Sequence, residues 1–88
     1  MIQKDFEIVN KLGLHARASA LFVKTASQFA SEVRLAREAV EVNGKSIMGI
    51  MMLAASKGST VKLTVEGSDE VEAMDAIGAL IQDGFGED

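Results

Sequence analysis

The amino-acid sequence predicts an α/β (α+β) fold in which helices cover one face of a four-stranded sheet. Four short segments alternate apolar and polar side chains with a period of two, which is typical of strands with one buried face. Three other segments carry the apolar faces and end signals of helices. Their order is strand, helix, strand, strand, helix, strand, helix, which favours two layers packed around one core.

Length and composition indicate one domain over residues 1–88, because a chain of 88 residues suffices for one core but not for two. Apolar residues make up 48% and charged residues 25%, which favours a globular protein over a disordered or membrane protein. No apolar stretch near the N-terminus resembles a signal peptide, and the longest apolar run, residues 47–55, is far shorter than a membrane span. We therefore expect a cytoplasmic protein that does not bind a membrane.

Charge and residue types exclude several classes of function. The net charge is -4, the Lys and Arg residues are scattered, and neither Tyr nor Trp offers a stacking surface, so nucleic acid is not an expected partner. The absence of cysteine excludes a disulfide framework, a thiolate metal site and a cysteine nucleophile. We expect neither a metal ion nor a cofactor.

The N-terminal part is predicted to form a strand and then a helix. The apolar face of the strand has residues at even positions, which are Ile2, Phe6 and Ile8, although Lys4 interrupts it. An amphipathic helix is predicted from about residue 15 to residue 30. Its apolar face carries Ala18, Phe22, Ala26, Phe29 and Ala30.

The middle of the chain is predicted to form a hairpin and a short helix. Two strands flank Arg37 and Glu38, and their apolar residues are Val33, Leu35, Val40 and Val42. Asn43 and Gly44 end the hairpin. Ser46 is a suitable cap for a helix from residue 47 to about residue 55, because its oxygen can accept a bond from the first turn. Lys57 and Gly58 are predicted to stop this helix.

The C-terminal part is predicted to form a strand and a helix. Val61, Leu63 and Val65 alternate with polar residues, and Gly67 closes the strand. Capping oxygens and carboxylates in residues 68–72 mark a helix start. The predicted buried stripe is Val71, Met74, Ile77, Gly78 and Ile81, and residues 84–88 end the helix. Periodicity leaves the strand order open, so a ferredoxin-like arrangement with an added C-terminal helix also fits.

His15 is the candidate reactive residue, because it follows a glycine-containing turn and opens the first helix. The unpaired N–H groups of a first turn favour an anion, and the helix dipole disfavours an imidazolium, which leaves a neutral ring with a nitrogen lone pair. Arg17 supplies a charged fork suited to phosphate oxygens. Local physics supports a phosphoryl-transfer centre and a purely structural helix cap about equally.

His15 lies within a longer sequence motif. Residues 10–19 are Asn-Lys-Leu-Gly-Leu-His-Ala-Arg-Ala-Ser, which resembles the active-site segment of the HPr family of phosphocarrier proteins. The matching residues are Gly13, Leu14, His15, Ala16 and Arg17. Residues 44–51, Gly-Lys-Ser-Ile-Met-Gly-Ile-Met, resemble the family's second signature, and the order of elements matches along essentially the whole chain. Ala18 departs from the usual proline but is a good helix former, so we expect the site to survive with a looser entry loop.

The resemblance implies an HPr-like open-faced sandwich of four antiparallel strands with three helices on one face. It implies that His15 accepts a phosphoryl group, that Arg17 stabilises the phosphate, and that backbone N–H groups of Ala16 and Arg17 bind it. The implied donor is enzyme I of the phosphoenolpyruvate-dependent phosphotransferase system, and the acceptor is an enzyme IIA component. Such a carrier is not an enzyme by itself, and we expect a monomer. The sugar-uptake and nitrogen-related branches use the same chemistry.

The segment around Ser46 allows two roles. Gly44, Lys45 and Ser46 imitate the end of a phosphate-binding loop, but that fingerprint needs a glycine where Ala39 stands, so nucleotide binding is rejected. One role for Ser46 is a helix cap. The resemblance to the HPr family implies a second, because in some branches the matching serine is a regulatory site phosphorylated by an HPr kinase/phosphorylase.

The short helix after Ser46 is too apolar to bury every side chain. Ile50 and Leu53 are expected in the core, while partner docking is assigned to Ile47, Met48 and Met51. Two other functions remain open, a small-molecule sensor with His15 as a structural cap, and an adaptor that acts through Met48 and Met51 alone.

Overall fold

The structure is a computed structural model that describes residues 1–87. Its element order is the predicted one. The elements are β1 (Ile2–Glu7), α1 (Ala16–Ala26), β2 (Glu32–Arg37), β3 (Val40–Asn43), α2 (Ile47–Met52), β4 (Thr60–Glu66), α3 (Glu70–Gln82) and the 3-10 turn η1 (Gly84–Gly86).

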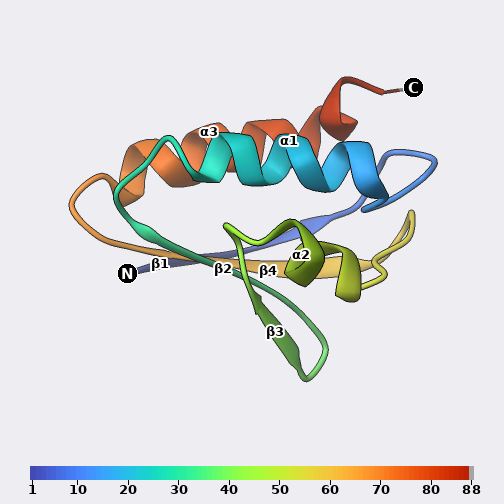
Figure 1. Cartoon of the computed structure of the whole chain (residues 1–88), viewed down its shortest axis with the longest axis horizontal. Coiled ribbons are helices and arrows are strands. Elements are labelled where there is room, and N and C mark those ends of the chain that lie inside the picture. The colour runs from blue at the N-terminus through green and yellow to red at the C-terminus, as the bar shows by residue number, and fades with distance from the viewer. Residues whose placement is uncertain (88) are drawn as a thin grey trace.

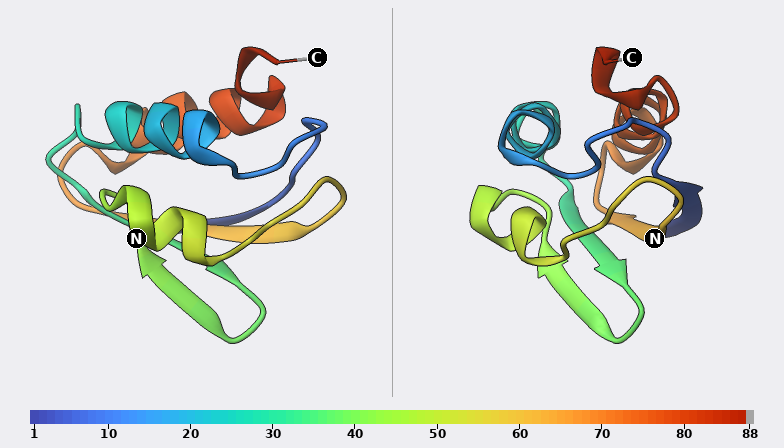
Figure 2. Two further views of the ribbon diagram at one scale, coloured as in Figure 1. Left: turned by 45° about the vertical axis from the view of Figure 1, so that its right-hand side comes forward. Right: turned by 90° about the vertical axis from the view of Figure 1, so that its right-hand side faces the viewer.

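The four strands form one antiparallel sheet in the order β1-β4-β2-β3. β4 lies in the middle, with Val65 opposite Ile2 of β1 on one side and opposite Val33 of β2 on the other. The three helices cover one face of this sheet, and α1 and α3 lie side by side above it (Figures 1 and 2). The predicted open-faced sandwich is therefore confirmed, and the strand order is now known.

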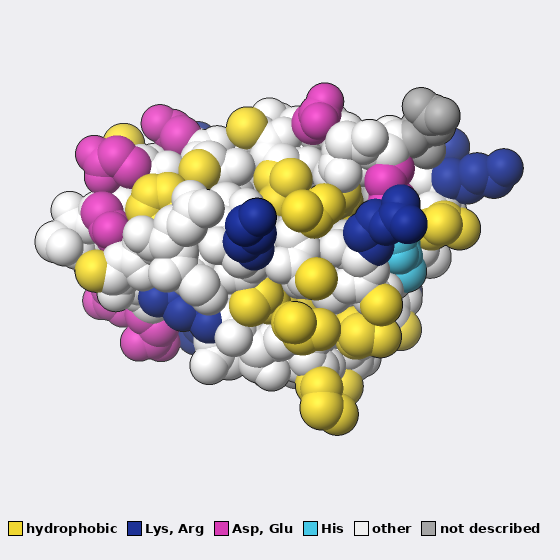
Figure 3. All heavy atoms as spheres, turned by 45° about the horizontal axis from the view of Figure 1, so that its top comes forward, with side chains coloured by type: hydrophobic (Ala, Val, Ile, Leu, Met, Phe, Trp, Pro, Cys, Tyr) yellow, Lys and Arg dark blue, Asp and Glu magenta, His cyan; other side chains and the backbone are white. Residues whose placement is uncertain are grey.

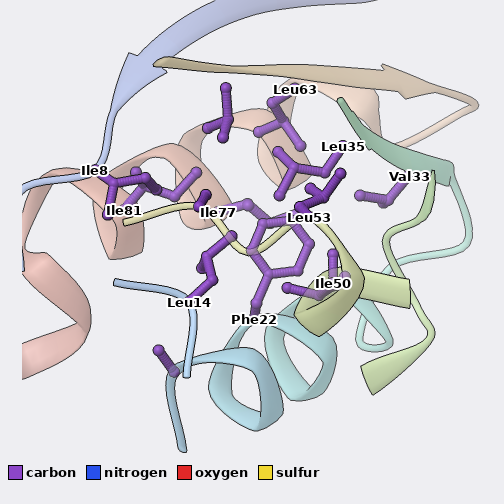
Figure 4. Packing of buried hydrophobic residues seen from close by; sticks show 14 of the residues in the cluster. Ile8, Leu14, Phe22, Val33, Leu35, Ile50, Leu53, Leu63, Ile77 and Ile81 are labelled. Atoms are coloured by element: carbon purple, nitrogen blue, oxygen red, sulfur yellow. The ribbon is translucent and has the colours of Figure 1, made fainter. Parts of the chain in front are cut away.

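The core lies between the sheet and the helices. Its largest fully buried side chains include Phe22 of α1, Leu35 of β2, Leu63 of β4 and Ile77 of α3, which meet in the middle of the molecule (Figure 4). α3 packs tightly against β1 at Gly78, where a β-carbon would lie 2.9 Å from the ring of Phe6. One core thus buries a face of the sheet together with the apolar faces of the helices, which is why alternating and helical patterns both occur in the sequence.

The predicted end of the first helix is wrong, because α1 ends at Ala26 rather than at residue 30. Two distant side chains bind the backbone beyond the helix. Nζ of Lys45 donates to the carbonyl of Phe29 at 2.7 Å, and the carboxylate of Asp69 accepts from the N–H of Ala30 at 2.8 Å. These bonds satisfy backbone groups that a longer helix would use, so the chain turns into β2.

The predicted end of the second helix is also wrong, because α2 ends at Met52 instead of near residue 55. Ala54 has a positive φ of 50°, which is incompatible with a continuing helix. The carbonyl of Ala55 accepts a hydrogen bond from the N–H of Leu14 at 2.9 Å. The predicted stop, Gly58, lies in the turn that follows and has a φ of 92°.

The start of α3 agrees with the prediction in position but not in detail. Asp69 occupies the N-cap position, yet its side chain makes no capping bond, because it accepts from the N–H groups of Ala30 and Ser31 instead. Glu70 accepts from the N–H of Gly67 at 3.1 Å. Met74, Ile77, Gly78 and Ile81 are buried as predicted.

Val71 was expected in the same buried stripe, and this prediction is wrong, because its side chain is 57% exposed. The buried residues of α3 begin with Ala73 and Met74. The first turn of α3 lies at one end of the two-layer structure (Figure 1), where solvent reaches Val71.

The interactions of Asp69 predict an acid-sensitive stability. The pKa of this carboxyl is lowered from its ordinary value of 3.8, first by the hydrogen bond from the Ser31 hydroxyl and then by that from the Ala30 N–H. A group whose pKa falls on folding stabilises the protein above its unfolded pKa, and this stabilisation is lost as pH falls through the folded pKa. We expect Asp69→Asn to lower the free energy of unfolding near neutral pH and to weaken its decline in acid.

Urea unfolding between about pH 3 and pH 7 measures this effect. Asp75→Asn is the matched control, because Asp75 is an exposed carboxylate on α3 with no hydrogen bond to the described residues. Equal pH profiles for Asp69→Asn and Asp75→Asn would contradict the prediction.

Candidate functional site

His15 is the N-cap residue of α1, as the sequence predicts. Its backbone is extended, with φ -78° and ψ -177°, and its carbonyl accepts from the N–H of Ser19 at 2.9 Å. In the side chain, Nδ1 accepts a long hydrogen bond of 3.3 Å from the backbone N–H of Arg17. An N–H of the first turn is therefore directed at one ring nitrogen of His15.

The loop before His15 is bound to the segment after α2. Gly13 has a φ of 66°, and a β-carbon there would lie 2.4 Å from the carbonyl oxygen of Ala55, so a larger residue does not fit. The next residue, Leu14, is buried and donates its N–H to the same oxygen. This contact holds the start of α1 beside the end of α2.

Glu87 is a site residue that sequence reasoning missed. Its Oε2 lies 2.6 Å from Nε2 of His15, and its Oε1 accepts from Nδ2 of Asn10 at 3.1 Å. Asn10 also donates to the carbonyl of Gly13 at 2.8 Å, so one buried amide joins the tail to the loop. The sequence predicts only that residues 84–88 end the last helix, because no periodicity indicates that they fold back. Asp88 lies outside the described residues.

The tail reaches His15 because the chain reverses direction at η1. Gly84 and Phe85 have positive φ values of 64° and 58°, and Phe85 is buried with 3% exposure. Burial of this ring anchors the tail to the core. The tail then runs above the N-terminal end of α1 (Figure 1).

The carboxylate of Glu87 lies beside the ring of His15 and interacts with the charge of Arg17. The pKa of the Glu87 carboxyl is lowered, chiefly by the hydrogen bond from Asn10 and further by the bond to His15 and the charge of Arg17. The side chains of His15 and Glu87 are 26% and 16% exposed. The ring is thus partly covered and partly open to solvent.

Arg17, predicted to stabilise phosphate, lies in the first turn of α1 and is exposed. Within residues 1–87 its guanidinium makes no hydrogen bond, so all of its donors face the pocket or solvent. The pocket has a volume of about 820 Å³. Its lining residues are Lys11, Leu12, His15, Ala16, Arg17, Gly86 and Glu87.

The chain's single histidine is visible at the surface between Lys or Arg side chains and hydrophobic side chains (Figure 3). The hydrophobic surface includes the residues predicted for docking. Ile47, Met48 and Met51 are 44%, 76% and 42% exposed, while Ile50 and Leu53 are buried, as predicted. Leu12 and Met52 are also strongly exposed, although neither is predicted to take part in docking.

Ser46 caps α2, as predicted, because its Oγ accepts from the N–H of Gly49 at 3.1 Å. α2 contacts α1 and β3, so this cap lies on the helix that carries the exposed methionines. Ser46 itself is half-buried.

Residues 1–87 contain neither a cluster of metal-binding side chains nor a membrane-spanning helix. Over residues 1–87 there is no group of three or more His, Cys, Asp or Glu residues that could hold a metal ion. In the same part of the chain, every helix is too short or too polar to cross a membrane.

Comparison with known proteins identifies the family. Residues 2–83 match the family described as PTS HPr component phosphorylation site. The chain is 58% identical over 87 residues to the phosphocarrier protein HPr of Neisseria meningitidis serogroup A, covering 99% of this chain and 98% of that protein. It is equally similar, over the same share of both chains, to the HPr of Cupriavidus necator.

Solved structures agree with this relation. A crystal structure of HPr from Thermoanaerobacter tengcongensis matches with a TM-score of 0.96 and 52% identity, covering 100% of this chain and 99% of that one. HPr from Bacillus anthracis matches with a TM-score of 0.88 and 44% identity, over 92% and 96% of the two chains. The family match, the relatives and the helix-capping histidine agree, and the chain belongs to the HPr family of phosphocarrier proteins of the phosphotransferase system.

Proposed function

We propose that the chain carries its phosphoryl group on Nδ1 of His15. The observation that carries this proposal is the position of Nδ1 at the start of α1, where it accepts from the N–H of Arg17. A nitrogen that accepts a hydrogen bond has a lone pair, and the lone pair is what attacks phosphorus. Nδ1 therefore is the nucleophile of the resting protein.

The same helix start stabilises the product. A phosphoryl group on Nδ1 lies at the positive end of the α1 dipole, within reach of the backbone N–H groups of Ala16 and Arg17. The guanidinium of Arg17 adds a charged planar donor that suits phosphate oxygens. These groups hold the phosphate by charge and hydrogen bonds, and they supply no group that would hydrolyse it.

The donor and the acceptor proposed for this relay are enzyme I and an enzyme IIA component. Both have to reach His15, and the exposed side chains of Ile47, Met48 and Met51 offer an adaptable apolar docking surface on the neighbouring α2. We place this relay in the cytoplasm and assign the chain the role of a carrier that is itself chemically unchanged over a full cycle. The branch that it serves, sugar uptake or nitrogen-related regulation, depends on which IIA component takes the phosphate.

A regulatory role is proposed for Ser46. Its Oγ is half-buried at the start of α2, next to the exposed Ile47 and Met48. A phosphate on this oxygen would place about two negative charges beside the docking surface, where they disfavour burial against a partner. An HPr kinase/phosphorylase would be the modifying enzyme.

Phosphorylation of His15 is tested with enzyme I and phosphoenolpyruvate. The protein is expected to take up one acid-labile phosphate, while His15→Asn takes up none. Asparagine is the matched substitution, because its oxygen retains the N-cap interaction, whereas His15→Ala would also cost about 1 kcal/mol of stability. A sensor or an adaptor predicts the opposite, namely no phosphate on His15 and full function in His15→Asn.

The effect of Ala18 is tested by Ala18→Pro. Ala18 lies in the first turn of α1, where the backbone N–H has no partner within the helix, so proline removes no helical hydrogen bond. We expect stabilisation by about 0.5 kcal/mol and a transfer rate from phospho-enzyme I within about twofold of the parent. The control, Ala20→Pro, breaks a bond inside the helix and should cost about 3 kcal/mol. A large change of transfer rate in Ala18→Pro would contradict this expectation.

Regulation at Ser46 is tested by comparing Ser46→Asp with Ser46→Asn. Both residues cap a helix well, so the two variants differ in charge rather than in stability. We expect Ser46→Asp to transfer phosphate more slowly from enzyme I or to the IIA component, and Ser46→Asn to transfer at the parent rate. Equal rates for the two variants with every partner would rule out charge-based regulation at this residue.

A further inference from the structure

The carboxylate of Glu87 is held against His15 by a preorganised part of the chain. Phe85 is buried and fixes the tail, and the amide of Asn10 binds both Oε1 of Glu87 and the carbonyl of Gly13. The second oxygen of Glu87 then lies 2.6 Å from Nε2 of His15. Exposed ion pairs between long side chains contribute little, but here neither partner has to be ordered when the contact forms.

The two hydrogen bonds of the His15 ring agree on one tautomer. Nδ1 accepts from the N–H of Arg17, so the proton of the neutral ring is on Nε2. The carboxylate of Glu87 has only acceptor oxygens, and it accepts the hydrogen bond that Nε2–H donates. The other tautomer would direct Nδ1–H at the N–H of Arg17 and the Nε2 lone pair at the carboxylate, and both contacts would be repulsive.

We propose that Glu87 is a positioning residue for phosphoryl transfer, which keeps the proton on Nε2 of His15 and offsets the positive charge that the ring acquires when Nδ1 bonds to phosphorus. The inference rests on the proposed function, since it assumes that His15 is the acceptor. It adds a residue from the C-terminal tail to the reaction and assigns it a chemical task.

The transfer step balances without a proton leaving the ring. The Nδ1 lone pair forms the bond to phosphorus, while the bond between phosphorus and the donor breaks and its electron pair leaves with the donor. The ring then carries phosphorus on Nδ1, a proton on Nε2 and one positive charge. Glu87 accepts a hydrogen bond from Nε2–H before and after the transfer. In the onward step the N–P electron pair returns to Nδ1, which leaves the same neutral tautomer.

The charges around the ring show why an anion is useful at Nε2. Arg17 of α1 and Lys11 of the preceding loop line the pocket, and both attract the phosphate of the donor. The same two cations, together with the positive end of the helix dipole, disfavour a positive ring. Glu87 is the carboxylate that lines this pocket among the described residues, so it opposes that repulsion at the atom opposite the reacting nitrogen.

The test compares Glu87→Gln with Asp83→Asn. Glutamine retains an oxygen for Nδ2 of Asn10, so it keeps the anchor of the tail, and it replaces the charged acceptor at Nε2 of His15 by an uncharged NH2 donor. Asp83→Asn removes the same charge from the same end of the chain, at an exposed side chain that makes no hydrogen bond to the described residues. The contrast between the two variants isolates the loss of the charged acceptor at Nε2 from a general loss of negative charge.

Two measurements read the role of Glu87 directly. Nitrogen-15 NMR of the His15 ring, recorded with the ring neutral, should report protonated Nε2 in the parent and in Asp83→Asn, and a shift toward the Nδ1–H tautomer in Glu87→Gln. Phosphoramidate, a small phosphoryl donor that needs no docking surface, should phosphorylate His15 about tenfold more slowly in Glu87→Gln than in Asp83→Asn, as followed by phosphorus-31 NMR.

A purely structural role for Glu87 would leave both readouts unchanged, since glutamine keeps the tail in place. Unchanged ring nitrogen signals, or equal phosphorylation rates for Glu87→Gln and Asp83→Asn, would therefore overturn the inference. The proposed function fails by a different result, which is the absence of phosphate on His15 of the parent protein after incubation with enzyme I and phosphoenolpyruvate.

Discussion

The hydrogen bond from the N–H of Leu14 to the carbonyl of Ala55 is the contact on which the rest of the site depends. It forms because Gly13 has no side chain and adopts a positive φ, which lets two loops approach to a distance that any β-carbon would prevent. The bond places the start of α1 beside the end of α2. It adds to the packing of α1 against α2, so His15 and the exposed side chains of Met48 and Met51 lie on neighbouring helices.

His15 stands at a helix end rather than within a helix, and this position determines which groups its side chain meets. An N-cap residue has an extended backbone, so its side chain points across the first turn and meets N–H groups that have no partner in the helix. The phosphate that the family carries is an anion and suits this position. Partial exposure then lets a partner reach the ring, while Glu87 and Asn10 limit the orientations that it adopts.

The surface around His15 carries both charged and apolar side chains (Figure 3). Lys11 and Arg17 place positive charges on the lining of the pocket, whereas Met48 and Met51 expose flexible apolar side chains. A carrier has to bind its donor and its acceptor in turn and release both. Flexible apolar side chains next to a charged pocket suit such transient contacts better than a rigid, fully apolar interface would.

Alternation and helical periodicity predict the strands, the existence of all three helices, the layering and the position of His15, because they report which side of each element is buried. It placed the helix ends at residues 30 and 55 incorrectly, since Lys45, Asp69 and Leu14 bind the backbone there from distant parts of the chain. Packing of the whole chain sets the strand order and brings Glu87 to His15, 72 residues apart in sequence. A local pattern indicates which face of a segment is buried. Which other segment covers that face depends on how the whole chain packs.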